Sequence, residues 1–226
     1  MRAAAFDVNE TLLDLRALDP LFKRVFGDAA ARVTWFNQVI QSALLQNALN
    51  SYAPFGVIAR AAVTMAGQRL GVDVPESAAD QIVTAMTSLP AYPDVRDALI
   101  ALRRAGYQVA AFSNGTRAAV TAQLTSAGLI DVFDVVISAD DAKHLKPAKQ
   151  AYHHAAKIMR TPPRQLWMVA AHAWDIAGAK RASLRTAFIA RPGAAYDPLF
   201  AAPDLIAHDL AEFVQKLVQR EWGTPT

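Results

Sequence analysis

Five short apolar runs, each ending in a polar or loop segment, constrain the fold of this chain most. They cover residues 2–6, 108–112, 133–137, 166–170 and 186–189. Such runs, with little alternation of polar residues, are typical of strands that are covered on both faces. Helical patterns lie between or after the later runs, at residues 95–105, 116–127, 148–159 and 174–182. This alternation predicts an α/β fold with a Rossmann-like, doubly wound parallel sheet.

The segment 15–89 interrupts this rhythm, because it contains no convincing strand. Its helical patterns cover residues 34–49, 55–70 and 75–87. We therefore predict two domains, a core of residues 1–14 and 90–226 and a helical cap domain of residues 15–89. The cap is inserted directly after the first strand of the core.

Composition excludes several classes of protein. The 226 residues are 53% hydrophobic and 19% charged, which is too apolar for a disordered chain. Cysteine is absent, so disulfides, thiolate catalysis and zinc–cysteine sites are excluded. The arginines are scattered, which favours solvated helix faces over a nucleic-acid partner. The sequence shows no signal peptide pattern and no apolar run of the roughly 18–20 residues that span a bilayer. We expect a cytoplasmic protein with no membrane partner.

Polar side chains that could take part in catalysis or ligand binding follow four of the predicted strands. In open parallel sheets, ligands bind beyond the carboxyl ends of the strands, where the strand order switches. Taken singly, each of these residues has an ordinary explanation as a helix cap, a turn or a surface loop. Their occurrence in order after separate strands favours a functional site instead. The residues are Asp7, Thr11, Ser113, Asn114, Lys146, His172 and Asp175.

Four motifs in the chain resemble those of the haloacid dehalogenase superfamily. They are Phe-Asp-Val-Asn-Glu-Thr-Leu at residues 6–12, Phe-Ser-Asn at 112–114, Lys-Pro at 146–147 and Trp-Asp at 174–175. Two features are similar to the type II (S)-2-haloacid dehalogenases in particular. Tyr152 follows the Lys-Pro pair, and the segment Val-Ala-Ala-His-Ala-Trp-Asp at 169–175 resembles their Ser-Ser-Asn-Ala-Trp-Asp. The resemblance covers essentially the whole chain, including the position of the cap.

The resemblance implies a mechanism on short 2-haloacids. Asp7 would attack the carbon that bears the halogen, and water would hydrolyse the resulting ester to a 2-hydroxy acid. Lys146 would keep Asp7 ionised, and Asp175 would orient or deprotonate the water. Thr11 would bond Asp7, while Asn114 and Tyr152 would line the pocket and steady Lys146 and Asp175. The groups expected to bind the substrate carboxylate are Ser113 and the backbone N–H groups of Val8 and Asn9.

Asn9, two residues after Asp7, is the position that distinguishes a dehalogenase from a phosphatase. Phosphatases of the superfamily carry Asp there, as the acid that protonates the departing alkoxide. General acid catalysis typically contributes about 10²–10⁴-fold, and Asn cannot supply the proton. A halide leaves as a stable anion without one. A monocarboxylate substrate also needs no magnesium, so we expect no metal and no other cofactor.

Two alternatives remain open at this stage. The chain could be a small-molecule phosphatase of the same superfamily, with Asn9 as a turn residue. It could also be a catalytically weak homologue kept for binding. The oligomeric state is open as well, since members of the family often form homodimers and the apolar cap helices could supply the face.

Three departures from the family pattern concern the leaving halide and the last motif. The family usually places an Arg after the cap Trp, where it holds the halide, but Phe36 follows Trp35 here. Ala170 and His172 stand where the family has Ser and Asn. Losing a donor to a developing anion commonly costs about 10²–10³ in rate. His172 and the N–H groups of Trp35 and Trp174 are the candidates to receive a small halide, such as fluoride or chloride, in a pocket that Phe36 also lines.

Overall fold

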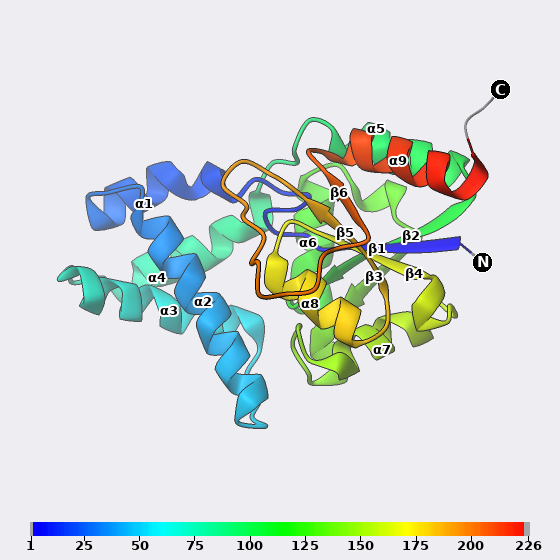
Figure 1. The fold of residues 1–226 in the computed structure, drawn as a ribbon. Helices are drawn as coiled ribbons and strands as arrows, with labels where there is room; N and C mark the ends of the chain where they lie inside the picture. The colour runs from blue at the N-terminus through cyan, green and yellow to red at the C-terminus, as the bar shows by residue number, and fades with distance from the viewer. Residues whose placement is uncertain (1, 224–226) are drawn as a thin grey trace.

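The computed structural model describes residues 2–223, apart from the side chain of Trp222, and contains a six-stranded parallel sheet (Figure 1). The strand order is β3-β2-β1-β4-β5-β6, and every neighbouring pair is parallel. The strands are β1 Arg2–Phe6, β2 Tyr107–Ser113, β3 Val135–Ser138, β4 Leu166–Ala170, β5 Arg185–Ile189 and β6 Leu205–Ala207. The predicted α/β class is confirmed, and β1 and β4 have the predicted bounds.

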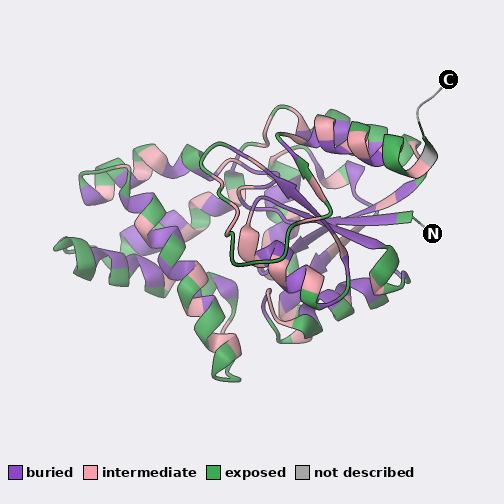
Figure 2. Cartoon of the chain, viewed as in Figure 1, coloured by how far each residue is buried: buried purple, intermediate pink, exposed green. Residues whose placement is uncertain are grey.

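Helices cover both faces of the sheet (Figure 1). On one face lie α5 Val95–Arg104, α6 Arg117–Ser126 and α9 Leu210–Trp222, and on the other α7 Lys149–Ile158 and α8 Ala173–Arg181. Side chains alternate along a strand, so Ala4 and Phe6 pack in the first hydrophobic cluster, and Ala3 and Ala5 in the second. The strands β1, β2, β4 and β5 are therefore buried over most of their length, as Figure 2 shows.

The sequence did not predict β6. This strand has only three residues, and Ile206 at its centre is half exposed. Edge strands of this length carry too little apolar pattern to be distinguished from a loop. Asp204, just before the strand, accepts hydrogen bonds from the backbone N–H and the hydroxyl of Thr186 in β5, which ties the edge to the sheet.

The regular elements between β1 and α5 are all helical. They are η1 Leu15–Leu18, α1 Asp19–Phe26, α2 Ala31–Ala48, α3 Phe55–Leu70, α4 Glu76–Ala85 and η2 Met86–Ser88. We refer to residues 15–88 as the helical segment. Figure 1 shows it beyond the end of the sheet toward which β1 runs. None of the described helices combines the length and the apolar character needed to cross a bilayer.

The chain changes direction across the sheet between β3 and β4. From β1 it steps outward through β2 to β3, and it then returns to place β4 on the other side of β1. The carboxyl ends of β1, β2 and β4 thus lie side by side at the switch in strand order. At such a switch, the loops that follow neighbouring strands lead to opposite faces of the sheet. The helical segment lies at the same end of the sheet (Figure 1).

Candidate active site

Asp7 follows β1 and is almost completely buried, with its backbone N–H donating to the Val169 carbonyl at 2.9 Å. Its Oδ1 accepts a hydrogen bond from Lys146 Nζ at 2.8 Å, and its Oδ2 accepts one from Thr11 Oγ1 at 2.7 Å. Burial by itself would raise the pKa of Asp7. The positive charge of Lys146 and the hydrogen bond from His172 outweigh burial, so the pKa lies well below its usual value. Asp7 is an ionised carboxylate at neutral pH.

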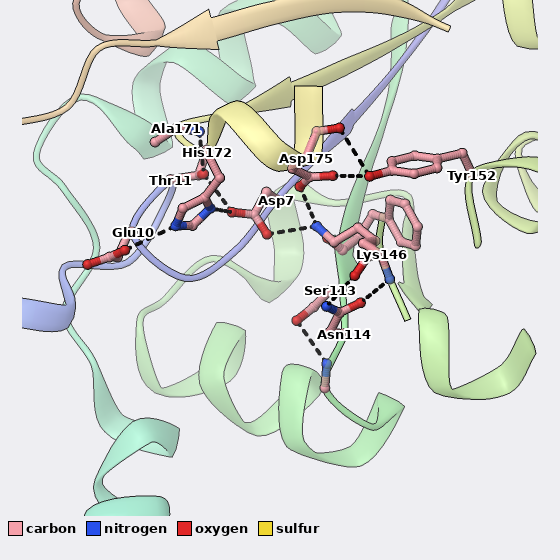
Figure 3. A network of polar contacts seen from close by, with 12 residues as sticks. Asp7, Glu10, Thr11, Ser113, Asn114, Lys146, Tyr152, Ala171, His172 and Asp175 are labelled. Carbon is pink, nitrogen blue, oxygen red and sulfur yellow. Dashed lines mark hydrogen bonds and ion pairs between the residues drawn. The ribbon is translucent and has the colours of Figure 1, made fainter. Parts of the chain in front are cut away.

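Lys146 is the cation at the centre of the site, and its side chain is buried (Figure 3). Its Nζ donates to Asp7 Oδ1, to Asp175 Oδ2 at 2.7 Å and to the Phe112 carbonyl at 3.1 Å. Burial disfavours the ammonium, but the two carboxylates outweigh that effect and raise the pKa of Lys146. Asn114 fixes the backbone of Lys146, since its Oδ1 accepts from Lys146 N at 2.7 Å and its Nδ2 donates to the Lys146 carbonyl at 3.3 Å.

Asp175 lies in the first turn of α8 and is fully buried. Both of its carboxylate oxygens already have donors: Oδ2 accepts from Lys146 Nζ, and Oδ1 accepts from the Tyr152 hydroxyl at 2.7 Å. Burial raises the pKa of Asp175, and Lys146 opposes that effect. Asp175 is thus a partner of the Lys146 ammonium, and Tyr152 contacts Asp175 rather than Lys146.

His172 connects Asp7 to a second carboxylate, that of Glu10 (Figure 3). Its Nδ1 lies 3.1 Å from Asp7 Oδ2 and its Nε2 lies 3.0 Å from Glu10 Oε2. Burial would lower the pKa of His172, but the hydrogen bonds to Asp7 and Glu10 outweigh burial and raise the pKa to about 10. The imidazole is therefore protonated at neutral pH and gives Asp7 a second positive neighbour.

A small cavity adjoins Asp7 on the side of the helical segment. Its volume is about 10 Å³, roughly the space that one water molecule needs. The residues that line it are Asp7, Asn9, Phe36, Ile40, Phe55, Ser113, Asn114, Lys146, His172 and Trp174. Neither Asp175 nor Tyr152 is among these lining residues. The cavity therefore joins a polar wall from the strand ends to an apolar wall from α2, α3 and Trp174.

A larger cavity of about 500 Å³ opens beside the small one and shares with it Phe36, Ile40, His172 and Trp174. Three arginines, Arg16, Arg32 and Arg191, line this outer cavity. Arg191 donates to the Thr11 carbonyl, and Arg32 contacts Glu10 at 3.5 Å. Within residues 2–223, no group of three His, Asp or Glu side chains is placed to hold a metal ion.

Two predictions about the leaving halide need correction. Trp35 is fully buried within the helical segment, its indole N–H donates to the Ala59 carbonyl at 2.9 Å, and it does not line the cavity. It packs against Phe22, with ring centroids 5.2 Å apart, and serves the core of the segment. His172 does line the cavity, but both of its ring nitrogens face carboxylates. The ring nitrogens of both residues thus already face acceptors within the chain.

The remaining predicted residues lie at or beside the small cavity. Phe36 and Trp174 form part of its apolar wall, and Trp174 stacks on His172 with centroids 5.2 Å apart. Ser113 lies on the polar wall, where its Oγ accepts the Gly115 N–H at 3.1 Å. Val8 and Thr11 are buried next to Asp7 without lining the cavity. Asn9 lines it, and its Oδ1 accepts from Gln123 Nε2 at 3.0 Å.

Sequence analysis missed Glu10 and Gln123. Glu10 adopts a left-handed backbone conformation, with a φ of 60°, which non-glycine residues seldom adopt and which turns its side chain toward His172. Gln123 lies in α6 and donates to both Asn9 and the Met86 carbonyl, so it joins the loop after β1 to the helical segment. Glu10 lies within the first motif and Gln123 lies on a helix, and no spacing in the sequence marks either of them as part of the site.

Comparison with known proteins gives a consistent result. A family profile described as haloacid dehalogenase-like hydrolase matches residues 1–183. The (S)-2-haloacid dehalogenase of Pseudomonas fluorescens is 28% identical over 221 residues, covering 96% of this chain and 97% of that protein. The (S)-2-haloacid dehalogenase 4A of Burkholderia cepacia is 30% identical over 195 residues, covering 85% of this chain and 84% of that protein.

A solved structure of an L-2-haloacid dehalogenase has a TM-score of 0.91 to this chain at 27% identity, covering 96% of this chain and 98% of that one. The family profile matches residues 1–183, and the relatives and the solved structure cover 85–96% of this chain. These findings confirm the resemblance that the four motifs indicated. The chain belongs to the haloacid dehalogenase-like hydrolases.

Proposed function

We propose that this protein is a hydrolytic dehalogenase that converts short (S)-2-haloacids to 2-hydroxy acids through an ester on Asp7. One observation carries the proposal: Asp7 is an ionised carboxylate on a cavity wall, held by Lys146, and the residue two places on is Asn9. The names of the relatives, (S)-2-haloacid dehalogenases, support the choice of substrate.

Asp7 would act as the nucleophile. A carboxylate attacks saturated carbon only when it is ionised and positioned, and Lys146, Thr11 and His172 provide both conditions through their contacts with its two oxygens. Displacement would invert the carbon, release the halide and leave a 1-carboxyalkyl group esterified to Asp7. The helical segment would act as a cap, because Phe36, Ile40 and Phe55 cover this carboxylate with apolar surface.

Asn9 supports a halide over an alkoxide as the leaving group. Its side chain is buried, and its Oδ1 accepts the Gln123 amide. An amide in this position has no acidic proton to give, so an alkoxide would leave without assistance. The aromatic wall of the cavity favours short haloacids such as haloacetates and 2-halopropionates, and the residues of the wall would have to move to admit them, because the cavity holds about one water molecule.

We propose that the substrate carboxylate is bound by Ser113 and the backbone N–H groups of Val8 and Asn9. Ser113 lies on the cavity wall beside Asp7 and Lys146. Three arginines and one carboxylate, Glu10, line the outer cavity, and this excess of positive charge would attract the anionic substrate. For Asp175 we propose a supporting role in which it holds Lys146, because its oxygens are occupied by Lys146 and Tyr152.

Halide release from a panel of haloacids tests this function. Purified protein is incubated with fluoroacetate, chloroacetate, bromoacetate and each enantiomer of 2-chloropropionate, and free halide is measured over time. We expect release from the haloacetates and from (S)-2-chloropropionate, with the Asp7→Asn variant at the level of buffer. No release above that variant would contradict the proposal. Phosphate release from a small phosphomonoester that requires Mg²⁺ and is abolished by EDTA would favour the phosphatase alternative.

A further inference from the structure

His172 forms the middle of a chain of three groups. Its Nδ1 faces Asp7 Oδ2 at 3.1 Å and its Nε2 faces Glu10 Oε2 at 3.0 Å, as Figure 3 shows. A nucleophile within hydrogen-bond reach of a base, with the base oriented by a third group, is the arrangement of nucleophilic catalysis in general. Here the nucleophile is a carboxylate, so its ester must be opened by water.

His172 is better placed than Asp175 to act on that water. His172 lines the small cavity and the outer cavity, and 13% of its side chain is exposed. Asp175 is fully buried, and both of its oxygens accept hydrogen bonds from Lys146 and Tyr152. Of these two groups, the imidazole is the one on a cavity wall and in contact with Asp7.

We propose that His172 is the general base that activates water for hydrolysis of the ester on Asp7, and that Glu10 is a positioning residue for His172. This inference rests on the proposed function, and it assigns to His172 the water activation that the family resemblance gave to Asp175. It also gives a reason for Glu10 in its left-handed conformation, because that conformation directs a carboxylate to Nε2 of the imidazole.

The charges in the site provide for the required change in protonation. In the free enzyme His172 is an imidazolium between the carboxylates of Asp7 and Glu10. The other groups around it are the neutral rings of Phe36 and Trp174, Arg32 on the far side of Glu10, and Lys146 on the other oxygen of Asp7. When Asp7 becomes an ester, its negative charge is lost, so the pKa of His172 falls.

The steps balance as follows for a substrate R–X. Asp7 carboxylate displaces X⁻ and forms the ester Asp7–O–R, and His172 then releases its proton to solvent through the outer cavity. Neutral His172 takes a proton from water as the water oxygen adds to the Asp7 carbonyl carbon, while Glu10 stabilises the new imidazolium. The tetrahedral intermediate expels the alkoxide, which takes the proton of the new carboxylic acid. Products are R–OH, X⁻ and one released proton, and Asp7 and His172 return to their starting states.

Single-turnover kinetics of the His172→Gln and His172→Asn variants test the inference. Lys146 and Thr11 still hold Asp7 in these variants, so we expect a burst of one halide per active site. Steady turnover should then fall by about 10²–10⁴-fold, the usual contribution of a general base. The ester should accumulate and appear by mass spectrometry on the peptide that contains Asp7. The exposed His208 provides a matched control, and His208→Gln should turn over like the wild type.

Two results would overturn the assignment while leaving the dehalogenase function intact. In the first, the wild type turns over but the His172 variants give no burst of halide. In the second, the His172 variants turn over without accumulating the ester. If the wild type itself releases no halide, the proposed function fails instead.

The pH dependence of ester hydrolysis tests the role of Glu10. The rate of ester hydrolysis should rise with pH as His172 loses its proton. The Glu10→Gln variant should shift this rise to lower pH. The Glu10→Asp variant should return the rise to the pH at which the wild type shows it. A rate that falls with rising pH, or no shift in Glu10→Gln, contradicts the base and positioning roles.

Discussion

Replacing Asp7 with Asn is expected to abolish halide release, with kcat lowered by about 10⁴-fold or more, as is typical when a nucleophile is removed. The amide keeps the shape of the carboxylate and still accepts a hydrogen bond from Lys146 or Thr11. It lacks the negative charge that attacks carbon, so the first step cannot proceed. Halide release from bromoacetate, whose leaving group is good, gives the most sensitive measurement of the loss.

The matched control is Asp73→Asn, which removes a carboxylate from an exposed position in the helical segment. We expect this variant to retain wild-type turnover. The thermal unfolding of Asp7→Asn should show a folded protein. If folded Asp7→Asn released halide at a rate near the wild type, Asp7 would not be the nucleophile, and the mechanism proposed here would have to be abandoned.

Replacing Lys146 with Met is expected to destabilise the protein by about 3–5 kcal/mol at neutral pH, because removing one partner leaves a buried charge uncompensated. Asp7 and Asp175 would then be two buried carboxylates that share no cation. In the wild type, the lowered pKa of Asp7 means that its ionised form adds stability above its unfolded pKa, and this stability is lost as the pH falls through the folded value. Chemical denaturation of both proteins measures the difference.

The deficit of Lys146→Met should narrow as the pH falls. Without the ammonium, burial raises the pKa of Asp175 further, whereas Asp7 keeps His172 as a positive neighbour, so Asp175 binds a proton already in mildly acid solution and the repulsion between the two carboxylates is relieved. The double variant with Lys146→Met and Asp175→Asn should recover much of the stability without recovering halide release. A Lys146→Met variant as stable as the wild type across this pH range would show that the ion network contributes nothing to the fold.

The predicted centre of the site follows from the strands. Apolar runs with little alternation located the ends of β1 and β4 to the residue, and parallel strands bring their carboxyl ends together. Asp7, Lys146 and Asp175 could therefore be predicted to meet although 139 positions separate the first two. The contact of His172 with Glu10 could not, because it depends on a backbone conformation at Glu10 that no sequence pattern reveals.

The helical segment was harder to predict in detail. Helical periodicity located α3 to the residue, but it does not say which face of a helix meets another domain. Trp35 and Phe36 are neighbours in α2, and successive residues point about 100° apart around a helix. The structure directs Phe36 to the cavity and Trp35 to the core of the segment, where Ala59 accepts its N–H. A prediction that assigned both to the pocket could only be half right.

The central claim is that the substrate passes through an ester on Asp7, and isotope labelling tests it most directly. A single turnover is run in H₂¹⁸O with enzyme in excess over chloroacetate, and the peptide containing Asp7 and the glycolate product are weighed by mass spectrometry. The mechanism predicts one ¹⁸O in the Asp7 carboxylate and ordinary oxygen in the glycolate hydroxyl, because water attacks the carbonyl of the ester. Label in the glycolate hydroxyl, with Asp7 unlabelled, would show that water attacks the substrate directly and would contradict the account.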